Sequence, residues 1–233
     1  SAPGLEPVPF SAWAEPAPPL AKIVPKVDTM FGVTMVDNYF WLREKTNPEV
    51  IDYLKAENAY TDSMTAGIKG LQDQLYNEII ARIKETDMSL PVKRADYYYY
   101  SRDEKGKQYK IYCRKKGSLD APEQVYLDVN ALGEGKRYVG IAGLSVSPNH
   151  ELLAYAVDTL GNEIYTVRVK NLTTGETYAE AIPNADGGLA WANDNKTLFY
   201  TTLDDILRPW QVWRHLVGGD PKEDVKVFEE PDQ

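Results

Sequence analysis

The chain has 233 residues, of which 43% are hydrophobic and 26% charged, which is enough for one large or two modest hydrophobic cores. Its formal net charge of -9, with no basic stripe to neutralise phosphates, argues against a nucleic-acid partner. A single cysteine, Cys113, excludes a disulfide framework and a cysteine-based zinc site, and we expect neither a metal nor another cofactor. No apolar run is long enough to span a membrane, and no targeting signal is visible. The sequence leaves the compartment unknown, with the cytoplasm favoured over the periplasm.

Composition divides the chain into three parts. Residues 1–26 are rich in proline and alanine and predict an extended tail, because each proline removes an amide donor. Residues 27–87 carry helical patterns. Residues 88–233 consist of short runs of aromatic and β-branched residues separated by turn residues, which is typical of antiparallel strands.

Two helices are expected within the middle part. Asn47-Pro48-Glu49 supplies an N-cap, a proline suited to the first helical position and an acidic residue that the helix dipole stabilises in the first turn. Apolar residues then recur at three- and four-residue steps, with an interruption at Gly67 and Gly70. The pattern predicts a helical pair over residues 48 to 85.

The β-rich part contains a repeat. Leu144–Tyr155 aligns with Leu189–Tyr200 as strand, polar turn and strand, and Val167-Arg168 aligns with Trp213-Arg214. The offset of about 45 residues is typical of the four-stranded blades of a β-propeller. An earlier unit spans Tyr97–Leu127, so the sequence predicts about three blades.

Three blades cannot close a ring, because propellers use four to eight. A fourth unit would begin near Phe228–Pro231. We therefore expect the exposed blade edges to be covered, either by further blades of the same polypeptide or by another polypeptide.

The helical part carries a recognisable series of motifs. Asp37–Arg43 (DNYFWLR), Asn47–Val50 (NPEV) and Glu57–Tyr60 (ENAY) resemble, in sequence and spacing, motifs near the start of prolyl oligopeptidase family members. Further segments are similar to oligopeptidase B in particular: Gly106–Tyr109 with Tyr112–Lys115, Gly117–Glu123 with Leu127–Asn130, and Leu207–Pro209 with Val212–His215. The resemblance covers residues 20–233.

This resemblance implies an N-terminal helical segment and part of a seven-bladed propeller, which caps an α/β-hydrolase domain that this chain does not contain. The helical segment is expected to pack beside that domain, and peptides to enter between the domains. Members similar to oligopeptidase B cleave short peptides after Arg or Lys with a Ser-His-Asp triad. The family places those three residues beyond residue 233, so none is carried over here.

The residue types in the chain agree that it has no catalytic triad. Ser145 lies in Gly143–Ser147, which lacks the final glycine of a nucleophile elbow. His150 occupies a polar turn and is expected to be solvated, whereas His215 follows Trp213 and Arg214 on a strand and is expected to be packed or hydrogen-bonded. Cys113 is expected to be a buried, inert thiol.

Other residues that could be taken for catalytic or binding groups have structural explanations. The pairs Asp120 with Glu123 and Asp204 with Asp205 are expected to be turn and cap residues. Alternate members of the run Tyr97–Tyr100 face opposite sides of a strand, which favours packing between blades over a stacking platform. Gly187-Gly188 lacks the Lys-Ser/Thr and helix of a phosphate-binding loop. We assign no catalytic, substrate-binding or metal residue.

Two functional hypotheses follow. In the first, the chain gates and orients short peptides for a serine oligopeptidase whose triad lies elsewhere, and is inactive alone. In the second, it is a non-catalytic binding or scaffold fragment derived from a propeller. A sequence with G-x-S-x-G followed by Asp and His, in the same or a partner polypeptide, would support the first.

Overall fold

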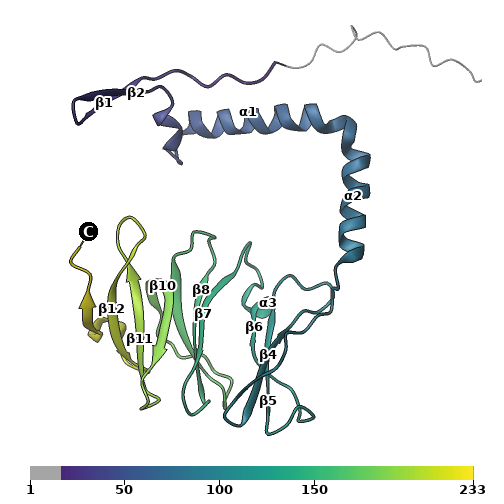
Figure 1. Ribbon diagram of the computed structural model, residues 1–233, viewed down its shortest axis with the longest axis vertical. Helices are drawn as coiled ribbons and strands as arrows, with labels where there is room; N and C mark the ends of the chain where they lie inside the picture. Colours follow the sequence, from purple (N-terminus) through teal and green to yellow (C-terminus); the bar gives the residue numbers. More distant parts are fainter. Residues whose placement is uncertain (1–16, 233) are drawn as a thin grey trace, which may run out of the picture. The chain divides into compact units, whose positions relative to one another are not determined.

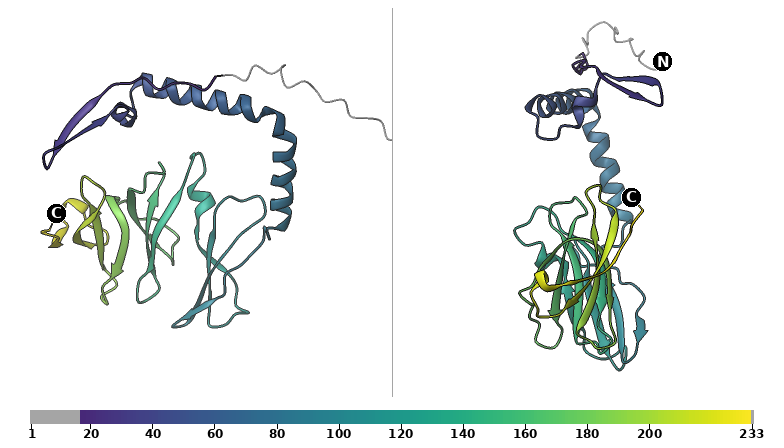
Figure 2. Two further views of the ribbon diagram at one scale, coloured as in Figure 1. Left: turned by 45° about the horizontal axis from the view of Figure 1, so that its top comes forward. Right: turned by 90° about the vertical axis from the view of Figure 1, so that its left-hand side faces the viewer.

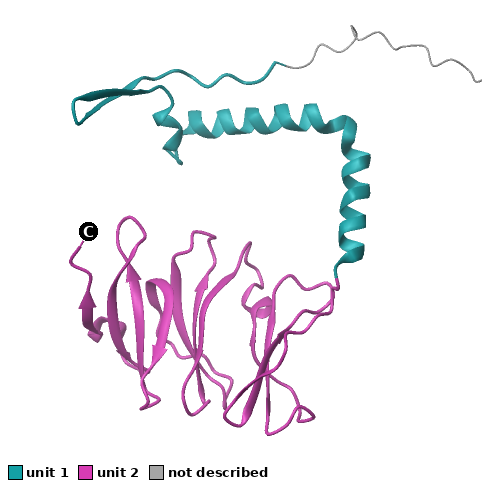
Figure 3. Cartoon of the chain, viewed as in Figure 1, with its two compact units in different colours: residues 1–83 teal, residues 84–233 magenta. Residues whose placement is uncertain are grey.

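The computed structural model describes residues 17–232 and divides the chain into two compact units, one ending at Ile83 and the other beginning at Lys84 (Figure 3). The boundary lies close to the change of composition at residue 87. Residues 17–25 have no regular secondary structure, and the rest of the expected tail lies outside the described residues.

The first unit begins with a β-hairpin, whereas the sequence predicts a helical segment over residues 27–87. Strands β1 (Lys26–Met30) and β2 (Val33–Asp37) pair antiparallel around Phe31 and Gly32. Both turn residues have positive φ, 52° and 79°, which is the requirement of the tight turns that match strand twist. A short 3₁₀ helix, η1 (Phe40–Arg43), follows.

The predicted helical pair is confirmed. Helix α1 (Pro48–Thr65) begins at the expected cap, where Asn47 Oδ1 accepts a hydrogen bond of 3.0 Å from the Glu49 amide. The turn η2 (Ala66–Ile68) contains Gly67, and α2 (Lys69–Arg82) follows (Figure 1). Val50 is the one buried residue of α1 and α2 has none, so within this unit the pair lacks a core of its own.

The second unit consists of antiparallel sheets in which strands pair in sequence order, as a propeller requires (Figures 1 and 2). The first blade contains β3 (Val92–Arg94), β4 (Tyr97–Arg102), β5 (Ile111–Lys116) and β6 (Gln124–Asp128), and the short helix α3 (Val129–Leu132) follows. The second and third blades contain β7 (Gly140–Val146), β8 (Leu152–Asp158), β9 (Tyr165–Asn171), β10 (Ile182–Trp191), β11 (Thr197–Leu203), β12 (Pro209–Leu216) and β13 (Val225–Glu229), with η3 (Pro221–Glu223) before β13.

Strand β10 joins the second and third blades into one seven-stranded sheet. Its first residues pair with β9 and its later residues with β11, and the register shifts between Ala185 and Leu189. The predicted repeat is therefore confirmed: β7–β8 and β10–β11 are equivalent strand pairs. Strand β13, which pairs with β12, completes the third blade, so the segment near Phe228 belongs to that blade.

Two hydrophobic clusters hold the blades together. Tyr99 and Tyr126 of the first blade pack with Leu153 and Tyr155 of the second. Alternate residues of β8, with Val167 and Val169, form the second cluster with Leu198 and Tyr200 of the third blade. Adjacent residues of β8 thus serve opposite blade interfaces, as the two-residue period of a strand dictates.

Candidate functional site

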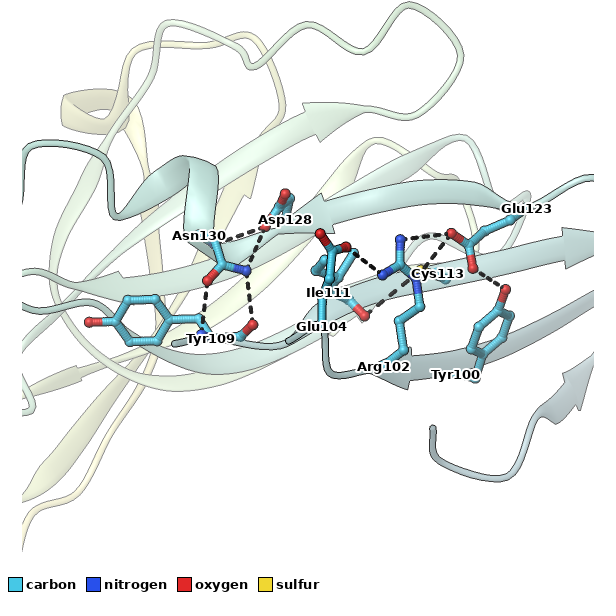
Figure 4. Close-up of polar contacts among 9 residues, drawn as sticks. All are labelled: Tyr100, Arg102, Glu104, Tyr109, Ile111, Cys113, Glu123, Asp128 and Asn130. Atoms are coloured by element: carbon cyan, nitrogen blue, oxygen red, sulfur yellow. Dashed lines mark hydrogen bonds and ion pairs between the residues drawn. The ribbon is translucent and has the colours of Figure 1, made fainter. Parts of the chain in front are cut away.

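A polar network lies on the first blade (Figure 4). Tyr100 takes part in it and faces away from the second blade, because the adjacent Tyr99 packs against that blade. Tyr100 donates to Glu123 over 2.5 Å, and Arg102 donates to Glu123 over 3.2 Å and to Glu104 over 2.9 Å. Desolvation opposes ionisation of Glu123, but the hydrogen bonds from Tyr100 and Arg102 outweigh it and lower its pKa. The expectation that Glu123 is only a turn or cap residue is wrong, whereas Asp120 does lie in the exposed turn before β6.

The same face buries the thiol of Cys113, which is 0% exposed beside Tyr100 and Ile111. Burial, together with the charge of Glu123, raises the pKa of Cys113 to about 12. The thiol is therefore protonated at neutral pH and unreactive, as the sequence predicts.

We expect Cys113 to resist a thiol-reactive disulfide reagent at pH 8 in the folded protein and to react after unfolding in urea. Because Cys113 is the one cysteine of this chain, mass mapping assigns the modification without ambiguity. Rapid labelling of Cys113 before unfolding would contradict its burial.

His150 is in a turn, as predicted, but it is not simply solvated. Its ring stacks on Tyr97 and Tyr99, and Nδ1 lies 2.7 Å from the Tyr99 hydroxyl. Arg114 donates to the His150 carbonyl over 2.6 Å. The turn joining β7 and β8 packs against the first blade, and the alignment of this turn with that of the third blade carries no information on such a contact.

The environment of His150 makes the junction between the first two blades sensitive to acid. Burial, and then the charge of Arg114, lower the pKa of His150 below its ordinary 6.5. Because the pKa of His150 is lower in the folded state than in the unfolded state, protonation favours unfolding. The stability contribution of the neutral ring is complete above the unfolded-state pKa, and it is lost as the pH falls below about 6.5.

We therefore expect the wild type to lose stability between pH 7.5 and pH 5.5 by more than a His150→Asn variant does. Asparagine suits the backbone at this position, where φ is 62°, but does not titrate. Urea unfolding at several pH values checks this, and an equal loss in both proteins would contradict it.

His215 is buried in the third blade, as expected, and is 0% exposed. Its Nδ1 lies 2.7 Å from Asp224 Oδ1, and Asp224 Oδ2 accepts from the Tyr200 hydroxyl over 2.9 Å. Nε2 lies 3.9 Å from Glu180 Oε1, which belongs to the loop between β9 and β10. The ring is thus hydrogen-bonded to Asp224, whereas Nε2 faces Glu180 without a hydrogen-bond partner among the described residues.

The remaining candidates are structural. The backbone carbonyl of Ser145 accepts from the Trp191 indole over 3.0 Å, between adjacent blades. Asp204 accepts from the amides of Ile206 and Arg208, which confirms a turn role, and Asp205 is exposed beside it. Gly187 lies within β10, so Gly187-Gly188 forms a strand irregularity.

A cavity of about 890 Å³ lies on the third blade near these turns. Tyr200, Trp210 and Trp213 give it aromatic walls, and Asn184 and Gln211 add amide groups. Such a cavity can hold a peptide side chain, but it contains no serine or cysteine nucleophile among its described lining residues.

Among residues 17–232, neither histidine has a serine or cysteine side chain as a hydrogen-bond partner. Over the same residues, no group of three or more His, Cys, Asp or Glu side chains is placed to hold a metal ion. No helix in the described part of the chain is long and apolar enough to cross a membrane.

Comparison with known proteins identifies the family. Residues 18–233 match the family model for the N-terminal β-propeller domain of prolyl oligopeptidase. The chain belongs to the prolyl oligopeptidase family. This match confirms the resemblance found in the sequence and the partial propeller.

Individual family members agree. The chain is 41% identical to dipeptidyl aminopeptidase BI of Pseudoxanthomonas mexicana, over 96% of this chain and 33% of the relative. It is 36% identical to protease 2 of Moraxella lacunata, over 92% of this chain and 32% of the relative. Oligopeptidase B from Leishmania major has a similar structure, with a TM-score of 0.85 and 36% identity, over 93% of this chain and 33% of that chain.

The chain therefore spans about a third of the length of these prolyl oligopeptidase family relatives. The region that it matches is their N-terminal propeller part, and the α/β-hydrolase domain of the family is absent from it.

The helical unit of this family member exposes much apolar surface. Phe31, at the hairpin tip, is 98% exposed, and Leu71, Leu75 and Ile79 of α2 are each about half exposed. Exposed apolar surface of this kind is a candidate surface for packing against another domain or chain.

Proposed function

We propose that this chain is the substrate-gating part of a serine oligopeptidase that hydrolyses short peptides after Arg or Lys. The observation that carries the proposal is the match of residues 18–233 to a peptidase propeller domain, in a chain whose two histidines are committed to structural contacts. The nucleophile, base and orienting acid would then lie in an α/β-hydrolase region outside this chain.

The exposed apolar surface of the helical unit supports a second element of the proposal. A hairpin and two helices without a core of their own need a partner surface to bury Phe31 and the apolar residues of α2. We assign that surface to the hydrolase region. The propeller would restrict entry to short peptides.

Fluorogenic peptides test the proposal. We expect the complete protein to cleave N-terminally blocked substrates with Arg or Lys before the scissile bond, and not to cleave matched substrates with Glu there. The isolated 233-residue chain, tested at the same concentration, is expected to show no hydrolysis.

One relative is named a dipeptidyl aminopeptidase, so the assay includes a matched pair of dipeptidyl substrates with free and blocked N-termini. Cleavage of the free substrate alone would contradict the proposed cleavage of blocked peptides after Arg or Lys, but it would still show a peptidase. Failure of the complete protein to cleave any substrate would favour the rival, a non-catalytic binding or scaffold protein.

A further inference from the structure

The interface between the first and second blades contains a buried arginine without a carboxylate partner. Arg114 is 3% exposed, yet it forms no ion pair with any carboxylate in residues 17–232. The Tyr97 ring, 4.3 Å from the Arg114 guanidinium carbon, compensates part of the charge. Because a buried charge is strongly unfavourable unless it is fully compensated, an external anion would stabilise this arginine.

The hydrogen bonds of Arg114 leave one end of its guanidinium group available. Nε donates to Gln124 over 2.7 Å, and Nη1 donates to the His150 carbonyl and to the Tyr99 hydroxyl over 2.6 and 3.2 Å. Within the described chain, Nη2 has no protein partner, so both of its N–H groups are free for a ligand.

Two further donors lie on the same cavity. The Tyr99 hydroxyl already accepts from Arg114, so we assign its proton to the bond with His150 Nδ1, which places the ring proton on Nε2. Lys116, two residues after Arg114 on β5, projects from the same face of the strand. Both Lys116 and His150 line a cavity of about 540 Å³ together with Arg114.

We propose that this cavity binds a small oxyanion, either phosphate or a carboxylate, held by Arg114, Lys116 and His150. Planar guanidinium groups suit such anions because two N–H groups can meet two oxygens. The cavity draws residues from both blades, so a bound anion would also join them.

Two carboxylates line the cavity and define the competing explanation. Glu151 accepts from the Asn149 side chain over 2.8 Å, and neither Asp96 nor Glu151 forms an ion pair with Arg114 or Lys116. If Asp96 were nevertheless the effective counter-ion of Arg114, no external anion would be needed.

Calorimetric titration of the complete protein with inorganic phosphate, acetate and chloride at matched ionic strength tests the proposal. We expect phosphate or acetate to bind saturably and chloride not to bind. Whichever of phosphate and acetate binds more tightly identifies the class of anion. If the titration heats of phosphate and of acetate both equal that of chloride, the proposed site is wrong.

Matched variants locate the binding. Lys116→Gln is expected to weaken binding of the anion about threefold to fivefold, the size of effect expected of an exposed charge contact. Lys115 lies on the opposite face of β5, so Lys115→Gln is expected to leave the affinity unchanged. Asp96→Asn is expected to strengthen binding by removing repulsion. Equal changes of anion affinity in the two lysine variants would contradict the proposal. So would a loss of stability in Asp96→Asn that added phosphate does not restore.

Discussion

Replacing Gly143 by alanine is expected to destabilise the protein by at least about 4 kcal/mol, or to prevent folding, because no side chain fits between β7 and β10. Gly143 has a φ of 55°, and a Cβ built on it would lie 2.0 Å from the carbonyl oxygen of Gly187. That oxygen belongs to the backbone of β10, so relief requires the strands of two blades to separate.

The matched control is Gly175→Ala. Gly175 has a φ of 82°, but a Cβ there would meet nothing within 4 Å, so this variant reports backbone strain without a clash. We expect it to cost about 1 kcal/mol. Urea unfolding followed by tryptophan fluorescence compares the two, and similar losses would contradict the close approach of β7 and β10.

Replacing His215 by phenylalanine is expected to cost about 3 kcal/mol or more, because it removes a partner from a buried carboxylate. The side chains of Asp224 and Glu180 are 4% and 5% exposed, and the imidazole lies between them. Phenylalanine retains the ring volume but donates no hydrogen bond.

A double variant isolates this cause. If the uncompensated carboxylate is responsible, adding Asp224→Asn to His215→Phe should recover part of the lost stability. Glu229→Gln, which removes the exposed partner of Lys226, is expected to change stability by less than about 0.5 kcal/mol. If His215→Phe lowers stability as little as Glu229→Gln does, the buried contact of His215 with Asp224 does not contribute as proposed.

The features that sequence analysis predicted correctly depend on local signals. Asn47 is followed by proline and an acid, which marks a helix start whatever the tertiary context. The repeat of Leu144–Tyr155 at Leu189–Tyr200 predicted equivalent strand pairs because each blade must pack on a similar neighbour.

The features that it missed depend on contacts between distant residues. Glu123 meets Tyr100 and Arg102 because β4, β5 and β6 are neighbours, a register that composition does not specify. His150 meets Tyr99 through the packing of two blades. The hairpin at Phe31-Gly32 had a local signal, a turn flanked by β-branched residues, that could have identified it.

The most direct test of the central claim is to label the complete protein with a serine-reactive fluorophosphonate and to map the modified residue by mass spectrometry. The account predicts one labelled serine, in a sequence outside residues 1–233, with no label on Ser145 or on any other serine of this chain. A labelled serine within residues 1–233 would contradict the account, because the catalytic nucleophile would then belong to the propeller part itself.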